Sequence, residues 1–386
     1  MNRMAPSLRV NVCNQRDKPF MSQNGSTDQS DEILATEAGF VPTALNVAED
    51  VFEGDSSESW QVAIRRAVRT TSRLRELLRL PPEPVSNTAK NGFPTFVPLE
   101  YLRRITPGDP NDPLLRQVLP IAAEDDSYSG ESADPVGDRD AVAAPGLLHK
   151  YHGRALLIVT GACGVHCRYC FRQEFPYRQD SGAADHWEHA IDYLSSHQEI
   201  EEVLLSGGDP LTQTDRSLSR LLHRIDSIDH IRRLRVHTRM PIVIPQRITD
   251  ELVELFRQLR MTTWFVVHAN HPRELDDAVL DRLGRLIDNG IPVMNQAVLL
   301  KGVNDDAATL IQLCRRLVDH RIQPYYLHQL DRVRGTQHFE VSVKVGNQLM
   351  TELRASLPGY AVPKYVVEDA GKTSKTPVRD DATGEV

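Results

Sequence analysis

From residue 154 onward, short apolar stretches alternate with amphipathic ones, and this alternation restricts the possible folds more than any other feature of the sequence. The apolar, β-rich stretches predict strands at 155–159, 202–205, 234–237, 263–268, 292–300 and 324–327. The stretches between them predict helices at 186–196, 217–228, 250–259, 276–289 and 306–320. Such alternation indicates a parallel sheet wound by right-handed crossovers. Six units are fewer than the eight of a complete barrel, so we predict an α/β fold built on a partial (β/α)6 barrel.

A group of polar residues ends or follows each predicted strand. The first strand leads into a loop with three cysteines, and the polar groups of the other five lie at 206–210, 237–239, 268–271, 295–296 and 328–331. In a barrel these positions are the carboxyl ends of the strands, where active sites are built. We therefore predict that the six groups share one mouth.

Three of the five cysteines, Cys163, Cys167 and Cys170, lie within eight residues in the loop after the first predicted strand. Their spacing lets three thiolates converge on one centre, and soft thiolate ligands favour an iron–sulfur cluster or zinc. The alternatives are a zinc knuckle completed by His166 or His152, and reduced cysteines that only line a core. A zinc site usually has a second closely spaced ligand pair, and the sequence has none, so a cluster with one open iron is favoured.

The first 58 residues differ from the rest of the chain in composition and charge. They are rich in Ser, Asn, Gln and acidic residues, and they carry a net charge of −6 out of −8 for all 386 residues. We predict a disordered acidic tail at 1–58, an N-terminal helical region with a linker at 59–150, the barrel at 151–335 and a C-terminal segment at 336–386.

Charge, hydropathy and cysteine usage exclude several classes of protein. The nearly neutral body of the chain argues against nucleic acid as the main partner. No apolar run is long enough for a membrane span, and the N-terminus lacks an apolar signal core. Five cysteines, three of them clustered, do not make a disulfide framework, so the reducing cytoplasm is the expected location.

The region before the barrel is predicted to be mainly helical. Residues 60–80 form an arginine-rich helical pattern, which more often indicates the solvated face of a packed helix than a surface for RNA or an acidic protein. Residues 91–119 predict short helices interrupted by turns. Residues 122–146 are rich in Asp, Ser, Gly and Ala and predict a surface linker.

Two short motifs suggest further chemistry. Gly207 and Gly208 allow the backbone to approach a ligand closely, although Gly-Gly-Asp-Pro is also an ordinary turn in which Asp209 caps a helix. Lys375 lies where a flexible loop can reach the barrel mouth, and a lysine amine there can anchor pyridoxal phosphate (PLP). A lysine in a loop of small residues is more often a solvated surface amine, as we expect for Lys372.

The Cys-x3-Cys-x2-Cys spacing, with Tyr169 before the last cysteine, resembles the radical S-adenosylmethionine (SAM) enzymes. The resemblance implies that Cys163, Cys167 and Cys170 hold a 4Fe-4S cluster, whose open iron binds the amino and carboxylate groups of SAM. It also implies that the segment 207–209 binds the methionyl amino group of SAM.

Over residues 90–378 the chain resembles the lysine 2,3-aminomutases in particular. The matching motifs are PGLLHKY at 145–151, PIVIPQRIT at 241–249, LLKGVND at 299–305, PYYLHQLD at 324–331 and the stretch from Gly359 to Lys375-Thr-Pro-Val. In this family the lysine that matches Lys375 carries PLP. A run of glycines usually precedes it, and this chain has Ala-Gly-Lys-Thr-Ser instead. With this departure, the chain looks most similar to the bacterial branch that makes (R)-β-lysine for attachment to elongation factor P.

The resemblance assigns roles to four more side chains. Arg172 would bind the substrate carboxylate by a bidentate contact, and Arg154 would contact the PLP phosphate, although a salt-bridged arginine at a strand end is an alternative for the latter. Asp331 and Glu368 match two acids that hold the ε-ammonium of lysine. Relatives that act on glutamate lack these acids, so the sequence indicates a cationic substrate.

The implied activity is that of an isomerase that moves the amino group of L-lysine from C2 to C3 with a 4Fe-4S cluster, SAM and PLP. The implied partners are L-lysine, an electron donor such as flavodoxin or ferredoxin, proteins of the elongation factor P pathway and a second copy of the chain in a homo-oligomer. Three alternatives stay open: an aminomutase for free β-lysine metabolism, a radical SAM enzyme of another reaction without PLP, and a non-enzymatic zinc or iron–sulfur binding module.

Overall fold

Six parallel strands form the centre of the fold and pair in chain order: β3 (Arg154–Thr160), β4 (Glu202–Gly207), β5 (Arg233–Thr238), β6 (Thr262–His268), β7 (Val293–Val298) and β8 (Gln323–His328). This computed structural model describes residues 59–81, 93–126, 128–177 and 187–378, and the tail predicted at 1–58 lies outside them. Each predicted strand is present within two residues of its expected limits, so the parallel α/β core is confirmed.

Two shorter strand pairs extend the sheet at its edges. β1 (Val142–Ala144) and β2 (Leu147–Tyr151) pair antiparallel before β3, β9 (Lys364–Val367) lies parallel to β8, and β10 (Thr376–Pro377) lies antiparallel to β9. The sheet therefore has ten strands in the order β1 to β10. Within the described residues β1 and β10 are not paired with one another, and the barrel is partial, as predicted.

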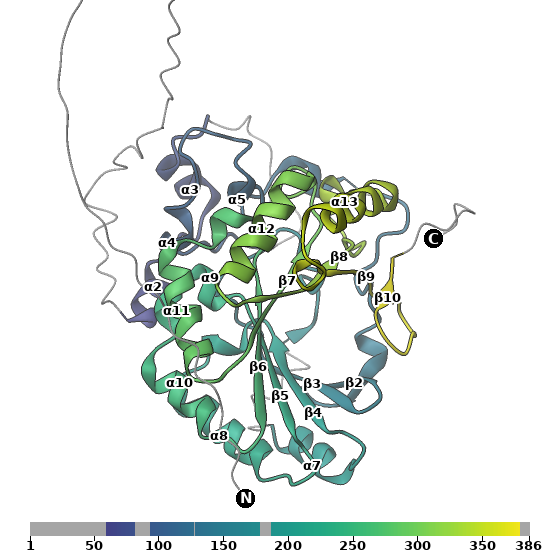
Figure 1. The fold of residues 1–386 in the computed structure, drawn as a ribbon. Helices are drawn as coiled ribbons and strands as arrows, with labels where there is room; N and C mark the ends of the chain where they lie inside the picture. Colours follow the sequence, from purple (N-terminus) through teal and green to yellow (C-terminus); the bar gives the residue numbers. More distant parts are fainter. Residues whose placement is uncertain (1–58, 82–92, 127, 178–186, 379–386) are drawn as a thin grey trace, which may run out of the picture. The chain divides into compact units, whose positions relative to one another are not determined.

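Helices connect the parallel strands and lie along the outer face of the sheet (Figure 1). The long ones are α7 (Glu188–Ser196), α8 (Asp215–Asp226), α10 (Asp250–Arg257), α11 (Asp277–Asp288) and α12 (Ala307–Asp319). Four of them begin with a side-chain cap, since Thr214, Thr249, Asp276 and Asp306 each accept a hydrogen bond from a backbone amide of the first turn. Short helical turns follow three of the strands: η3 (Pro210–Thr212), α9 (Met240–Val243), η4 (Pro245–Arg247) and η5 (Pro272–Glu274).

The N-terminal region is helical but more interrupted than predicted. Residues 60–80 form two helices, α2 (Trp60–Arg66) and α3 (Thr71–Leu77), and not one. Between them Val68 exchanges two backbone hydrogen bonds with Val97, and the Thr70 side chain then caps α3. The single-helix prediction was wrong because this distant pairing replaces the helical hydrogen bonds. Two short helices, α4 (Leu99–Leu102) and α5 (Pro113–Arg116), follow as expected.

Most of the described residues within 122–146 lie at the surface, but the segment is more than a plain linker. It contains η1 (Ala122–Asp125), η2 (Arg139–Ala141) and β1, and it includes two buried acids. Glu124 pairs with Arg168 of the cysteine loop, and Asp138 pairs with Arg172. The sequence did not predict these two pairs, because composition does not reveal that the acids have basic partners elsewhere in the chain.

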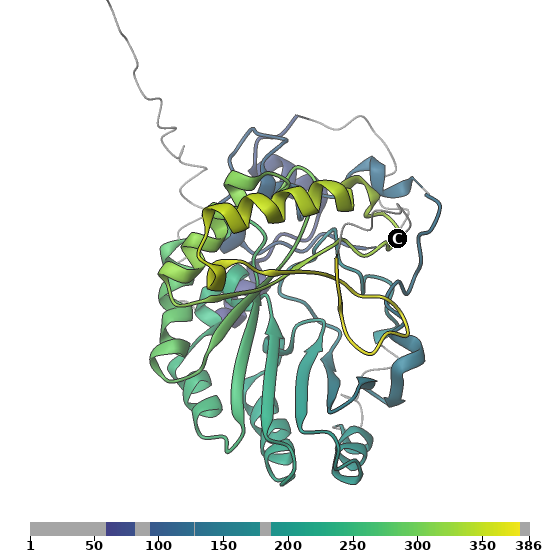
Figure 2. The same cartoon turned by 45° about the vertical axis from the view of Figure 1, so that its right-hand side comes forward.

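The C-terminal segment returns across the open side of the barrel. After η6 (Gln337–Phe339), α13 (Val343–Ser356) and η7 (Gly359–Ala361), the chain enters β9 and then a loop that leads to β10. Figure 2 shows this yellow loop in front of the sheet. Glu368 in the loop bonds to Lys150 of β2. The loop therefore lies close to the strand that precedes the barrel.

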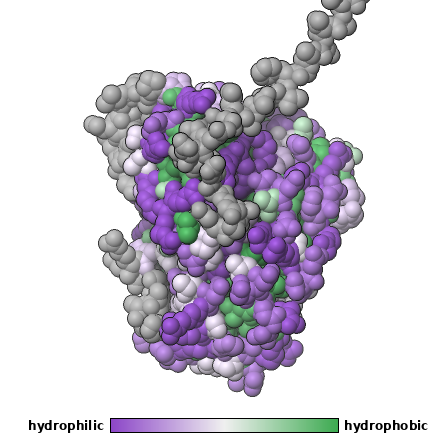
Figure 3. Space-filling view, turned by 90° about the vertical axis from the view of Figure 1, so that its left-hand side faces the viewer, coloured by the Kyte–Doolittle hydropathy of each residue, from purple (hydrophilic) through white to green (hydrophobic). Residues whose placement is uncertain are grey.

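One continuous apolar core joins the N-terminal helices, the barrel and the C-terminal segment, and it extends from Trp60 to Tyr365. The face in Figure 3, on the side of the outer helices, is mostly hydrophilic with small, scattered apolar patches. Among the described residues no helix has both the length and the apolar character that a membrane crossing requires.

Candidate active site

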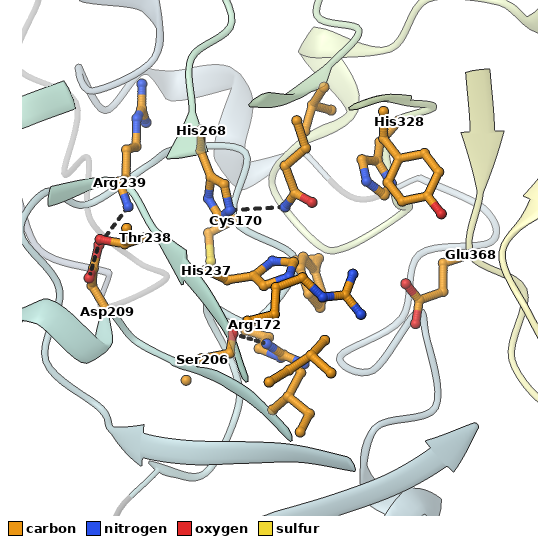
Figure 4. A pocket seen from close by; sticks show the side chains of 18 of the residues that line it. Cys170, Arg172, Ser206, Asp209, His237, Thr238, Arg239, His268, His328 and Glu368 are labelled. Carbon is orange, nitrogen blue, oxygen red and sulfur yellow. Dashed lines mark hydrogen bonds between the residues drawn. The ribbon is translucent and has the colours of Figure 1, made fainter. Parts of the chain in front are cut away.

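A cavity of about 680 Å³ extends from Arg154, Glu202 and Arg233, the first residues of β3, β4 and β5, to the carboxyl ends of the parallel strands (Figure 4). All six strand ends line it, through the cysteine loop, residues 206–209 and 237–239, His268, Gln296 and His328. The prediction of one shared mouth is confirmed. Asn295 and His271 do not line the cavity, and the Asn295 amide instead bonds to the backbone of Ala269.

Cys163, Cys167 and Cys170 are free thiols that line one part of the cavity. Burial raises the pKa of Cys163 and of Cys170, the latter to about 12, and the charge of Cys167 raises both further. Three converging thiolates require a positively charged partner, which the irons of a cluster supply. The thiols therefore fit the predicted 4Fe-4S cluster.

The zinc-knuckle alternative has no geometric support in the described residues. Neither histidine suggested as a fourth ligand lines the cavity with the three cysteines. His166, the first suggested fourth ligand, bonds through Nδ1 to the carbonyl oxygen of Pro94 and stacks on Phe93. The second, His152, is exposed.

Gly207 and Gly208 bring the loop after β4 against the cysteine loop. A Cβ on Gly208 would lie 2.3 Å from the carbonyl oxygen of Ala162, and one on Gly207, whose φ is +113°, would lie 2.6 Å from that of Thr160. The Gly208 amide donates to the same Thr160 oxygen at 2.7 Å. The two glycines are therefore needed for contact between the loops, and the Gly208 amide is already used by the protein.

Asp209 connects the ends of β4 and β5 (Figure 4). Its buried carboxylate accepts hydrogen bonds from the Thr238 hydroxyl and from the amides of Leu211, Arg239 and Met240, at 2.7–3.0 Å. Burial raises the pKa of Asp209 to about 6, although these donors oppose the rise. These contacts make Asp209 a positioning residue for both loops.

Arg172 is directed into the cavity by two partners that the sequence did not reveal. Its Nε donates to Asp138 at 2.7 Å, and its Nη1 donates to Ser206 at 3.2 Å. An arginine has five N–H donors, so three remain for a ligand carboxylate. Asp138 was missed because it lies in the predicted linker, where no local pattern marks it.

Glu368 joins two lysines inside the cavity. Lys150 donates to its Oε1 at 2.8 Å and Lys375 to its Oε2, and the Tyr151 hydroxyl also donates to Oε1, at 3.1 Å. Burial opposes the charge of Glu368, but the ammonium groups of Lys375 and Lys150 hold its pKa well below the usual value. The structure thus brings the two predicted residues Glu368 and Lys375 together and adds Lys150. Lys372, in contrast, is exposed, as expected.

Several side chains of the cavity, Asp331, His237 and His328 among them, have polar atoms without a protein partner within the described residues. No hydrogen bond reaches the Asp331 carboxylate, and the Nε2 atoms of His237 and His328 are buried and unpaired. Burial and the charge of Glu368 raise the pKa of Asp331 to about 7. Burial also lowers the pKa of both imidazoles, that of His328 to about 3. Unpaired buried groups are costly, so the cavity fits a ligand with polar groups at these positions.

The cavity has an excess of positive charge. Seven Lys or Arg side chains line it, against five Asp or Glu. Arg154 stacks over the ring of Tyr151 at 4.5 Å and forms no ion pair within the described residues, whereas Arg235 pairs with Glu202 at 2.6 Å. Arg154 therefore remains available for an anion, and this fits its predicted contact with the PLP phosphate.

Comparison with known proteins adds an independent result. Residues 157–314 match the radical SAM superfamily. A solved radical SAM methyltransferase from Sphaerobacter thermophilus aligns with a TM-score of 0.43 and 17% identity, over 58% of this chain and 71% of that chain. The L-lysine 2,3-aminomutase of Escherichia coli (strain K12) is 44% identical over 84% of this chain and 95% of its own length. That of Haemophilus influenzae is 41% identical, over 83% and 95%. The chain thus matches these two relatives over nearly their whole length.

Proposed function

Because this chain belongs to the lysine 2,3-aminomutases of the radical SAM superfamily, we propose that it converts L-lysine to β-lysine with PLP attached to Lys375. The chain is an isomerase, and enzymes of its family use a 4Fe-4S cluster, SAM and PLP. The proposed reaction moves the amino group from C2 to C3 while one hydrogen moves from C3 to C2. Atoms therefore balance, and the substrate is neither oxidised nor reduced overall.

The observation that carries this proposal is that an acid of the cavity already binds a lysine ammonium. Glu368 binds the ammonium of Lys375, and Asp331 faces the same cavity without a partner among the described residues. The site thus accommodates the functional group that a substrate lysine presents. We assign Asp331 and Glu368 to the ε-ammonium of the substrate and Arg172 to its carboxylate.

A chain of alternating charges connects these two ends of the substrate site. Arg172 pairs with Asp138, Asp138 lies 3.9 Å from Lys150, Lys150 pairs with Glu368, and Glu368 pairs with Lys375. Each charge in the chain holds its neighbours in place. The group that takes the substrate carboxylate and one that takes its ammonium therefore have a fixed separation, which suits a substrate of one length.

The residues of this chain fit the three cofactors. When bound, the cluster and SAM supply a radical that removes a hydrogen atom, and PLP carries the migrating nitrogen. Cys163, Cys167 and Cys170 would hold the cluster, residues 207–209 would support SAM, Arg154 would contact the PLP phosphate, and Lys375 would attach PLP covalently.

We further propose that the product serves the modification of elongation factor P, because the sequence Ala-Gly-Lys-Thr-Ser before Lys375 resembles that branch of the family. The four cysteines among the described residues are free, which suits the reducing cytoplasm. A flavodoxin or ferredoxin would then deliver the electron.

The test uses anaerobic, cluster-reconstituted protein with L-lysine, SAM, PLP and dithionite, and products are separated by chiral chromatography. We expect β-lysine from the parent protein. Lys375→Ala should lose both β-lysine formation and the absorbance of attached PLP, whereas Lys372→Ala, an exposed lysine of the same loop, should keep both.

Three other outcomes would contradict parts of the proposal. A Lys375→Ala protein that keeps attached PLP would exclude Lys375 as the anchor. A parent protein that binds no PLP would favour a radical SAM enzyme of another reaction. Cleavage of SAM to 5′-deoxyadenosine with free lysine unchanged would exclude free lysine as the substrate and lead to a test of lysine on elongation factor P.

A further inference from the structure

Arg239, at the end of β5, contacts one of the three cysteines directly. Its Nη1 donates to the Sγ of Cys167 at 2.7 Å. Its Nη2 donates to Gln117 at 2.7 Å and to Glu274 at 2.5 Å. Three contacts therefore fix the guanidinium against this thiol, and only 5% of Arg239 is exposed.

The carboxylate that orients Arg239 is itself rigidly held. Glu274 is fully buried, and its second oxygen accepts hydrogen bonds from the amides of Asn270 at 2.6 Å and His271 at 2.9 Å. The amide of Arg239 donates in turn to Asp209. Both the backbone and the guanidinium of Arg239 are thus fixed by buried acids, and the side chain cannot turn away without leaving Glu274 unpaired.

Two features indicate that this guanidinium faces a bound group. Arg239 lines the cavity, and its Nε is buried with no partner among the described residues. The other two cysteines differ from Cys167, because neither Cys163 nor Cys170 accepts a side-chain hydrogen bond within the described part of the chain. The contact with Cys167 is therefore specific to one ligand position.

We propose that Arg239 sets the reduction potential of the 4Fe-4S cluster through its hydrogen bond to Cys167. Hydrogen bonds to the cluster sulfurs and charges close to the cluster help to determine its reduction potential. The oxidised 2+ cluster takes one electron from an external low-potential donor and becomes the 1+ cluster. Arginine keeps its proton throughout, so a fixed positive charge stabilises the reduced cluster, which is more negative by one charge.

This inference rests on the proposed ligation by Cys167 and not on the proposed substrate. Arg239 is a positioning residue, since it acts on the cluster through a ligand. In the sequence, Arg239 is one of three polar residues that end or follow the strand predicted at 234–237. No local pattern marks it as the residue that contacts a cysteine.

The experiment is a redox titration of the reconstituted protein, followed by the EPR signal of the reduced cluster, without lysine or PLP and with iron content measured in each sample. We expect Arg239→Gln to lower the ratio of reduced to oxidised cluster about tenfold at a given solution potential, a shift of about 59 mV for one electron. Arg239→Lys should give a smaller shift in the same direction. Arg232→Gln, an exposed arginine immediately before β5, should leave the potential unchanged.

Several results would overturn the inference. Arg239→Gln protein with full iron content and the wild-type potential would do so directly. If Arg239→Gln loses the cluster, the potential is measured in Arg239→Lys instead, and a wild-type potential in that variant with full iron content would overturn the inference. Loss of the cluster from both variants, with the fold kept by circular dichroism, would assign Arg239 to cluster retention and not to its potential. Wild-type protein without a 4Fe-4S signal would refute the cluster site itself, whereas absence of aminomutase activity alone would refute only the proposed function.

Discussion

Asp331 lowers the stability of the folded protein when it is ionised, because its carboxylate has no hydrogen-bond donor among the described residues. Its carboxylate lines the cavity near Glu368 and accepts no hydrogen bond from the described residues. Burial and the charge of Glu368 raise its pKa from 3.8 to about 7. Since ionised Asp331 is less stable in the folded protein than in the unfolded chain, we expect Asp331→Asn to stabilise the protein without ligands.

The magnitude follows from the raised pKa. Each pH unit between the two pKa values corresponds to 1.36 kcal/mol, so at pH 8 ionisation of Asp331 costs the folded protein at most about 4 kcal/mol relative to the unfolded chain. The folded state holds this proton more tightly, so the contribution of Asp331 to stability falls as the pH rises from about 4 to about 7. Asparagine has the same shape without the charge. The variant should gain about 2 kcal/mol at pH 5.5 and about 4 kcal/mol at pH 8.

The assay is anaerobic urea unfolding of cluster-loaded protein without lysine, followed by tryptophan fluorescence at both pH values. Asp192→Asn, on an exposed position of α7, is the matched control and should change stability by less than about 0.5 kcal/mol. An equal gain at both pH values, or a loss at pH 8, would refute the reasoning, because only a raised pKa makes the gain grow with pH.

The same substitution should damage function while it improves stability. A lysine ammonium would pair with ionised Asp331, and loss of a charged partner of this kind typically costs 2–5 kcal/mol. We therefore expect kcat/KM for lysine to fall about 100-fold or more in Asp331→Asn. In the wild type, KM for lysine should rise as the pH falls below about 7, since the carboxyl is then protonated, and Asp331→Asn should lack this pH dependence.

Two other substitutions test the packing of the site. Lys150→Met leaves Glu368 with one cation fewer and should lower the free energy of unfolding, measured in urea, by about 3 kcal/mol. A double variant that also carries Glu368→Gln should recover part of this loss. Unchanged stability in Lys150→Met would contradict the importance of the buried pair. Gly208→Ala places a Cβ 2.3 Å from the carbonyl oxygen of Ala162, so iron content should fall by about half or more on analysis. In Gly284→Ala, in α11, the added Cβ would meet no atom within 4 Å outside its own helix, so the variant should keep its iron and gain up to about 1 kcal/mol of unfolding free energy. Equal iron content in both glycine variants would argue against the loop contact.

The fold was predictable where local pattern and burial agree. The strands of the barrel bury apolar side chains such as Val203 and Leu205, and their composition marks them in the sequence. The break between α2 and α3 was not predictable, because it depends on pairing between Val68 and Val97, and each of these stretches alone looks unexceptional. The short edge strands were missed for the same reason, since they are defined by their neighbours more than by their own residues.

The residues of the site also fall into two groups, those that a local motif predicts and those that only distant partners reveal. The cysteines were predicted from their spacing and Lys375 from its resemblance to the family motif, and the structure places all four side chains at the cavity. Asp138 and Lys150 were missed because their importance comes from partners 34 and 218 residues away, Arg172 and Glu368. A polar side chain that positions another has no sequence signature of its own, so the supporting residues of the site appear only in three dimensions.

The two lysines on Glu368 suggest how the site holds buried charge before and after its ligands arrive. Lys150 occupies one carboxylate oxygen and Lys375 the other. In the proposed function, Lys375 would lose its ammonium when it holds PLP, one oxygen of Glu368 would become free, and the ε-ammonium of the substrate would bind there. Breaking a buried pair by removing one partner typically costs 3–5 kcal/mol, whereas exchanging one ammonium for another avoids this cost. A permanent second cation on Lys150 would therefore keep Glu368 ionised during the exchange, and the proposed role of Glu368 gives a reason for its contacts with two lysines of the protein.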